Sequence, residues 1–180
     1  MKANSNPEIL RVLEGEGINF ECVSPGEIHR LLGLFPDIDR KRLLFTPNFA
    51  PRSEYQWGLD QGTWVTLDNL HTLRYWPKIF KNREVFIRID TGEGQGHHEH
   101  VRTAGTYSKF GIPLQEIEEM GDLLKRAGAR VVGLHAHTGS GILQADNWRM
   151  VGERLLALRG NFPELRFLDL CGVLGITVRR

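Results

Sequence analysis

Short apolar runs alternate with amphipathic stretches along the whole chain. Six runs are rich in β-branched and aromatic residues, and we expect them to form strands at 18–24, 42–48, 63–69, 84–90, 130–138 and 165–172. Between them, apolar residues recur at helical spacing, which predicts helices at Asn6–Glu14, Pro25–Leu34, Arg52–Gln61, Asn69–Phe80, Pro113–Ala127 and Ala145–Arg159. Pro25 and Pro113 suit the first turn of a helix, and Gly128 suits the position just after a helix ends.

Strands that alternate with helices indicate parallel strands joined by helical crossovers. Several of the predicted strands are apolar on both faces, as expected of a parallel sheet that is covered on both sides. This periodicity fits two architectures equally well. One is a doubly wound sheet, and the other is an eight-stranded α/β barrel, which typically needs about 250 residues.

The composition narrows the class of protein. The chain has 180 residues, of which 41% are hydrophobic and 25% charged, which is ordinary for one globular domain. The formal net charge is only +1, so there is no electrostatic reason to expect binding to nucleic acid or to an anionic membrane. The two cysteines lie far apart and lack metal-ligand spacing, and the polar N-terminus does not resemble a signal peptide. We therefore expect a cytoplasmic protein.

Polar residues follow the predicted strands, at the edge where α/β folds build their functional sites. They are Glu21, Ser24, Asn48, Asp68, Arg88, Asp90, His135, His137 and Ser140. Any one of them could serve only as a cap of a strand or helix, so their position alone does not establish a site.

The tract from His135 to Gly141, HAHTGSG, is the strongest local signal. His135 and His137 are two residues apart on a predicted strand, so both side chains point to the same face. One imidazole could stack on a planar ligand, while Gly139 and Ser140 offer donors to an anion. The histidines could instead bind zinc, although the sequence places no third ligand, or they could be hydrogen-bonded near the core.

A second histidine-rich segment, residues 92–100, is rich in glycine. Its evenly spaced glycines do not match the GxGxxG motif of dinucleotide-binding proteins. Its histidines could bind a metal ion, but this composition is more typical of a solvated loop. We expect no metal site in the chain.

Read together, these segments resemble the barrel domain of the diaminopimelate and ornithine decarboxylases, a family that uses pyridoxal 5'-phosphate (PLP). The motifs that carry the resemblance run in order along essentially all 180 residues: KANSN from Lys2, FECVSPGE from Phe20, FTPN from Phe45, Arg88-Ile89, SKFG from Ser108, GLHAHTGS from Gly133 and LDL from Leu168. The SKFG and HAHTGS motifs favour diaminopimelate decarboxylase. The chain is especially similar to the decarboxylase part of bifunctional aspartokinase–decarboxylases.

The resemblance implies an incomplete (β/α)8 barrel of the alanine racemase-like type, with about six of its eight strands, over residues 1–180. The family's C-terminal β domain would be absent. The implied reaction is decarboxylation of meso-2,6-diaminopimelate to L-lysine by a homodimer. Three alternatives stay open: an ornithine- or arginine-type decarboxylase, a non-catalytic PLP-binding remnant, and a single-barrel PLP-binding protein.

The resemblance also implies roles for individual residues. Lys2 would attach the cofactor covalently through its primary amine. His137 would stack on the pyridine ring of the cofactor, and Lys109 would lie near the substrate, so these three are the expected catalytic residues. The remaining cofactor-binding residues would be Ser140 and Gly172 at the phosphate and Glu21 and Arg88 near the ring.

The sequence departs from the family pattern at two places. The family has three glycines after LDL, but this chain reads Cys171-Gly172-Val173, and the two side chains would hinder a close approach of backbone to phosphate. In addition, the resemblance implies missing family segments before Lys2 and after Arg180, and residues 175–180 do not resemble the family. We therefore expect the chain by itself to be impaired as an enzyme.

Overall fold

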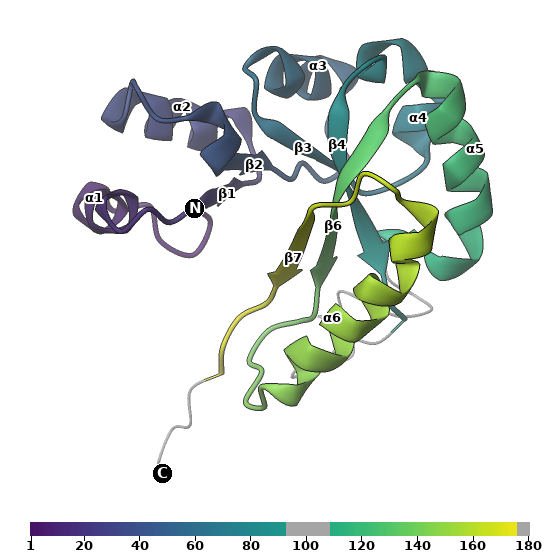
Figure 1. The fold of residues 1–180 in the computed structure, drawn as a ribbon. Coiled ribbons are helices and arrows are strands. Elements are labelled where there is room, and N and C mark those ends of the chain that lie inside the picture. The colour runs from purple at the N-terminus through teal and green to yellow at the C-terminus, as the bar shows by residue number, and fades with distance from the viewer. Residues whose placement is uncertain (93–108, 176–180) are drawn as a thin grey trace. The chain divides into compact units, whose positions relative to one another are not determined.

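The computed structural model describes residues 1–92 and 109–175. The chain divides into two compact units, residues 1–66 and residues 67–180. Each unit contains parallel strands with helices between them (Figure 1).

The first unit contains three parallel strands in chain order. Its elements are α1 (Pro7–Gly15), β1 (Phe20–Cys22), α2 (Pro25–Leu34), the 3₁₀ turn η1 (Arg40–Arg42), β2 (Leu43–Phe45), α3 (Arg52–Asp60) and β3 (Trp64–Leu67), which ends at the boundary. Cys22 lies opposite Phe45, and Phe45 lies opposite Val65. These three side chains are fully buried, as are Ile28 and Tyr55 on α2 and α3, so the core of this unit lies between strands and helices.

The second unit contains three longer parallel strands and one very short one. Its elements are α4 (His71–Tyr75), η2 (Pro77–Phe80), β4 (Glu84–Asp90), β5 (Ile112–Pro113), η4 (Leu114–Glu116), α5 (Ile117–Ala127), β6 (Arg130–His137), α6 (Asp146–Ala157), η5 (Leu158–Asn161) and β7 (Phe167–Cys171). β6 pairs with β4 on one side and with β7 on the other, and α6 packs against β6 and β7 (Figure 1).

Most of the predicted elements are confirmed. Each of the six predicted strand segments contains an observed strand, and α2 has the predicted bounds. Ser24 caps α2, since its hydroxyl accepts from the Glu27 amide, while the Glu27 carboxylate accepts from the Val23 amide at 2.7 Å. Gly128 ends α5 in the left-handed conformation, with φ of 67°.

Two predicted helices are wrong in part. The helix expected at Asn69–Phe80 breaks at Trp76 because Pro77 has no N–H and disfavours helical geometry in the residue before it. The helix expected from Pro113 begins only at Ile117, because Ile112 and Pro113 pair with the end of β4 as strand β5. Pro113 is therefore a strand residue and not part of a first helical turn.

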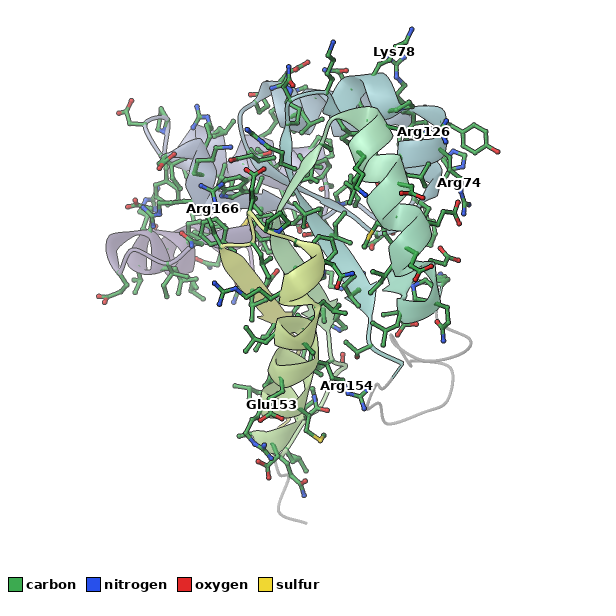
Figure 2. All side chains as sticks on the ribbon, turned by 45° about the vertical axis from the view of Figure 1, so that its right-hand side comes forward. Arg74, Lys78, Arg126, Glu153, Arg154 and Arg166 are labelled. Carbon is green, nitrogen blue, oxygen red and sulfur yellow. The ribbon has the colours of Figure 1, made fainter. Side chains whose placement is uncertain are left out.

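Three arginines labelled in Figure 2 tie elements of the second unit together. Arg154 on α6 donates to the carbonyl of Thr91 at 2.8 Å, just after β4. Arg166, before β7, lies 2.8 Å from the Glu84 carboxylate at the start of β4, and Arg74 on α4 lies 2.7 Å from Glu119 on α5. Such partly exposed ion pairs contribute at most about 1 kcal/mol each, so they orient the elements more than they stabilise them. Among the described residues, no helix is long and apolar enough to cross a membrane.

Candidate functional site

The candidate site in the second unit is arranged by the register of its strands. Arg88 on β4 lies opposite His135 on β6, which in turn lies opposite Asp169 on β7. Two residues further along, His137 lies opposite Cys171. Residues in register on parallel neighbours, and residues two apart on one strand, share a face. The five side chains therefore form two adjacent rows at the carboxyl end of the strands.

His135 is the most deeply buried member of this group, with 1% of its surface exposed. Burial lowers the pKa of His135 well below its ordinary value, and the positive charge of Arg88 and the neighbouring His137 lower it further. His135 is therefore neutral near pH 7. Its Nε2 lies 3.8 Å from Oδ2 of Asp169, which is a contact between a neutral ring and a carboxylate and not an ion pair.

The second row contains a histidine–thiol contact. Nδ1 of His137 lies 3.1 Å from Sγ of Cys171, within hydrogen-bonding distance for sulfur. Both residues are half-buried, and Cys171 is reduced. His137, which the sequence predicts to stack on a cofactor ring, is thus held from one edge by a side chain of the neighbouring strand.

Lys109 is brought next to Arg88 by one aromatic ring. The Lys109 ammonium lies 5.1 Å and the Arg88 guanidinium 4.9 Å from the centre of the Phe110 ring. Gly111 makes this approach sterically allowed, because it has φ of 83° and a Cβ there would lie 2.8 Å from the Asp90 amide nitrogen of β4. Arg88 and Lys109 therefore lie against the same ring, and a place for Lys109 near the substrate stays a prediction.

Beyond the two strands, the backbone of residues 138–142 continues to pair with residues 171–175. The amide of Val173 donates to the Gly139 carbonyl at 3.0 Å, and the amide of Gly175 donates to the Ile142 carbonyl at 2.8 Å. Gly139 and Gly141 have positive φ values of 125° and 72°, and glycine allows the backbone to adopt these turns within the paired segment. The segment that contains Ser140 thus lies alongside the segment that contains Gly172.

Gly172 lies very close to two polar side chains. A Cβ at position 172 would lie 2.6 Å from the Thr138 hydroxyl and 3.1 Å from Nε1 of Trp148 on α6. Thr138 is buried, and its hydroxyl has no hydrogen-bond partner among the described residues. A buried hydroxyl and an indole N–H beside a glycine backbone fit a phosphate group, which accepts several hydrogen bonds. The side chain of Ser140 is exposed and also accessible to such a ligand.

Two predicted site residues belong to the first unit. Lys2 is exposed, and Glu21 is a half-buried residue of β1 whose carbonyl accepts from the Met1 amino group at 2.9 Å. Their convergence with Arg88, His137 and the Gly172 region stays a prediction.

The residues of this region that were not predicted as site residues include Asp169, Cys171, Thr138 and Trp148. Asp169 and Cys171 are two residues apart on β7, so their side chains share a face. The sequence shows this spacing, but only the register with β6 shows that they lie opposite His135 and His137. Thr138 had no sequence signal of its own. The histidine-rich segment from position 93 onward, Ser108 of the SKFG motif and residues 176–180 lie outside the described residues.

Parallel strands with intervening helices, and polar side chains collected at the strand ends, define an α/β domain with a candidate ligand site at the strand ends. The chain matches the family model described as pyridoxal-dependent decarboxylase, pyridoxal binding domain, over residues 1–179. The chain therefore belongs to the pyridoxal-dependent amino-acid decarboxylases and corresponds to the domain that binds their pyridoxal cofactor.

Two solved structures and one curated relative show how far the similarity extends. A diaminopimelate decarboxylase from Methanothermobacter thermautotrophicus is 36% identical over 97% of this chain and 42% of its own length. A crystal structure of diaminopimelate decarboxylase superposes with a TM-score of 0.84 at 25% identity, over 98% of this chain and 42% of that one. The enzyme from Helicobacter pylori, in a complex with L-lysine, has a TM-score of 0.77 at 26% identity, over 92% of this chain and 44% of that one.

These matches confirm the predicted α/β barrel fold and exclude the doubly wound sheet. The chain spans about two fifths of the length of these relatives. None of the three is described as bifunctional, so the narrower similarity to aspartokinase–decarboxylases stays a prediction.

Proposed function

We propose that this chain is the cofactor-binding part of an enzyme that decarboxylates meso-2,6-diaminopimelate to L-lysine. The observation that carries the proposal is the 36% identity to a diaminopimelate decarboxylase over 97% of the chain, in a family whose fold and cofactor this chain shares. The similarity to the Helicobacter pylori enzyme, which was solved with L-lysine, supports the same substrate class. A homodimer in the cytoplasm is the corresponding assembly and location.

PLP supplies the electron sink that makes loss of carbon dioxide from an amino acid feasible, and the protein supplies orientation and electrostatics. In our proposal, Lys2 attaches the cofactor and His137 lies against its ring. The contact between Nδ1 of His137 and Cys171 limits rotation of the imidazole, which helps to keep the ring in one orientation. Glu21 completes the ring site in the same proposal.

The phosphate of the cofactor would be held where Gly172 allows a close approach. The Thr138 hydroxyl and the Trp148 indole N–H lie directly beside the Gly172 backbone, so close that a Cβ there would meet them, and Ser140 adds an accessible hydroxyl from the paired segment.

In the same proposal, Arg88 near the ring and Lys109 near the substrate make this part of the site cationic. Both lie against the Phe110 ring, and Arg88 is buried, so its charge is screened less than that of a surface arginine. A cationic pair suits an amino-acid substrate that carries two carboxylates, because one carboxylate is lost and the other needs a partner.

A second candidate function, weak PLP binding without turnover, is favoured by one observation. Cys171 and Val173 occupy positions where the family has glycines, and the Val173 amide already donates to the Gly139 carbonyl. An amide that is engaged in this way is not available to a phosphate oxygen. Ornithine- and arginine-type decarboxylation are alternatives within the same family.

The deciding experiment is a coupled assay for L-lysine with the purified 180-residue chain, added PLP and meso-diaminopimelate. Lysine formation that is lost in Lys2→Ala and kept in Lys125→Ala, a matched lysine on α5, would support the proposal. Cofactor absorbance without lysine would favour the binding protein if lysine is still absent after the family segments expected before Lys2 and after Arg180 are added. Faster carbon dioxide release from ornithine or arginine than from diaminopimelate would contradict the proposed substrate.

A further inference from the structure

We propose that the outer surface formed by α4, η2 and the end of α5 is a docking site for an acidic segment of another protein. We call it the α4–α5 surface, and its exposed side chains are Arg74, Tyr75, Lys78, Lys81 and Arg126. The segments that carry Lys81 and Arg126 lead into the amino ends of β4 and β6, whereas the candidate cofactor site is at the carboxyl ends of these strands. The proposal therefore goes beyond the proposed function and requires neither the cofactor nor a substrate.

Positive charge is concentrated in one stretch of the sequence. Residues 69–83 contain four lysines and arginines and no carboxylate, although the whole chain has a formal net charge of only +1. Arg74, Lys78 and Lys81 belong to this stretch, which forms α4, η2 and the approach to β4. The excess of positive charge is therefore local, and the composition of the chain does not account for it.

The fold adds the end of α5 to this stretch. Both α4 and η2 pack against α5. The Asn82 amide donates to the carbonyl of Gly128, the residue that ends α5, at 2.8 Å. A Cβ at Gly128 would lie 3.8 Å from Cγ of Lys81, so Lys81 lies beside the end of the helix that carries Arg126 in its last turn. In Figure 2, the side chains of Lys78, Arg126 and Arg74 extend outward on the same side of the second unit.

Only part of this charge is neutralised within the protein. The Arg74 guanidinium lies 2.7 Å from the Glu119 carboxylate. Within residues 1–92 and 109–175, Lys78, Lys81 and Arg126 form no ion pair. The negative end of the α5 dipole favours cations in its last turn, but that turn already carries two of its own, so Lys78 and Lys81 add charge beyond what the helix needs.

Tyr75 adds an exposed aromatic ring to the cations. It leaves 69% of its surface exposed, and its ring lies 4.5 Å from the ring of His71, measured between centroids. His71 in turn contacts Trp76 edge-on at 5.1 Å, so the Tyr75 ring is supported by its own helix. Tyrosine and arginine are among the residues that contribute most to protein interfaces, and a supported ring loses little conformational entropy when a partner covers it.

The charge of the surface selects an anionic partner, and the charge of the whole chain favours a protein over a nucleic acid. Nucleic-acid binding depends on neutralising many phosphates and is typical of strongly basic domains, whereas this chain is nearly neutral. Carboxylates form charge-assisted hydrogen bonds with lysine and arginine, and an apolar side chain between them can cover the Tyr75 ring. The expected partner is therefore a segment in which Asp and Glu alternate with apolar residues.

The test measures the fluorescence anisotropy of a fluorescein-labelled peptide in which Asp and Glu alternate with Leu. The 180-residue chain is added without PLP or substrate, so the result does not depend on the proposed enzyme function. We expect saturable binding at low ionic strength that is lost near 1 M salt, where charges are screened beyond about 3 Å. A peptide with Asn and Gln in place of Asp and Glu should bind at least roughly tenfold more weakly, because it lacks the complementary charge.

Single variants locate the binding on this surface. Lys78→Glu and Arg126→Glu should each weaken binding by roughly fivefold or more, because each replaces an attraction with a repulsion. Tyr75→Ala should weaken it by roughly fivefold to thirtyfold, the range for a side chain that contributes strongly to an interface. Arg159→Glu on η5 and Leu156→Ala on α6 are the matched controls, because both residues are exposed in the same unit, and neither should change the affinity by more than about twofold.

A gain of binding excludes unfolding as the cause of the losses. A peptide with Lys in place of Asp and Glu should bind the double variant Lys78→Glu with Arg126→Glu more tightly than it binds the parent chain. The proposal would be overturned by a parent chain that does not bind the acidic peptide, or by an affinity that is unchanged in Lys78→Glu or in Tyr75→Ala. Tighter binding of a single-stranded oligonucleotide with the same number of negative charges would also overturn it, since the surface would then recognise nucleic acid.

Discussion

Gly133→Ala is expected to destabilise the second unit, because β6 has no room for a methyl group at this position. A Cβ on Gly133 would overlap the ring of Phe86 on β4, with the Cζ atom only 2.5 Å away. Carbon atoms prefer separations of about 3.5–4.0 Å, so the ring must move by about 1 Å or more. Phe86 cannot move freely, since it is 5% exposed and stacks on Phe167 with ring centres 5.8 Å apart.

The expected cost is that of an overpacked core, about 1–3 kcal/mol. For a chain of this size, each kcal/mol corresponds to a decrease of roughly 2–4 °C in Tm. Thermal unfolding followed by circular dichroism gives the measurement, and urea unfolding gives the free energy independently. Gly121→Ala is the matched control, because nothing lies within 4 Å of a Cβ there, and it should stabilise α5 by about 0.5–1 kcal/mol.

A second variant tests the cause of the effect. Phe86→Leu removes the ring atoms that the new methyl group would meet. The double variant Gly133→Ala with Phe86→Leu should therefore lose less stability than the two single substitutions lose when their losses are added. A coupling energy of about 1 kcal/mol or more is expected for residues in direct contact. Strict additivity, or a Gly133→Ala variant as stable as the parent, would show that β6 relaxes away from Phe86 and that the steric argument is incorrect.

Three further predictions concern single side chains. Borohydride reduction with PLP should label Lys2, and peptide mapping that finds the label on Lys109 instead would contradict the assigned attachment site. The pKa of His135 in the folded protein lies below its ordinary value of 6.5, so the unfolded state binds a proton at this residue first as the pH falls. The free energy of unfolding should therefore decrease as the pH drops through and below 6.5. His135→Gln should reduce the dependence of this free energy on pH by up to about 1.4 kcal/mol per pH unit. Burial raises the pKa of Cys22 to about 12, so alkylation of the folded protein should modify Cys171 first and Cys22 only after unfolding. Mass spectrometry of the two cysteine-containing peptides measures the order of modification.

Local pattern was sufficient for most of the secondary structure. The helix at Pro25–Leu34 could be predicted with its bounds because Ser24, Pro25 and Glu27 are start signals that act within one turn. The break at Trp76 was also encoded locally, in Pro77, but the apolar spacing on both sides concealed it. Strand β5 could not be predicted, because two residues have no periodicity and their extended form depends on pairing with β4.

Within one strand, the two-residue period of the backbone determines which side chains share a face, so the sequence by itself determined that His135 and His137 point the same way. Which residues stand opposite them depends on how β6 and β7 align after a connection that includes α6, and nothing local encodes that alignment. Only the tertiary structure placed Asp169 opposite His135 and Cys171 opposite His137. Register between parallel strands is set by the packing of the intervening helix and core. The contact between His137 and Cys171, and the close contact of Gly133 with Phe86, therefore follow from the fold and not from the sequence alone.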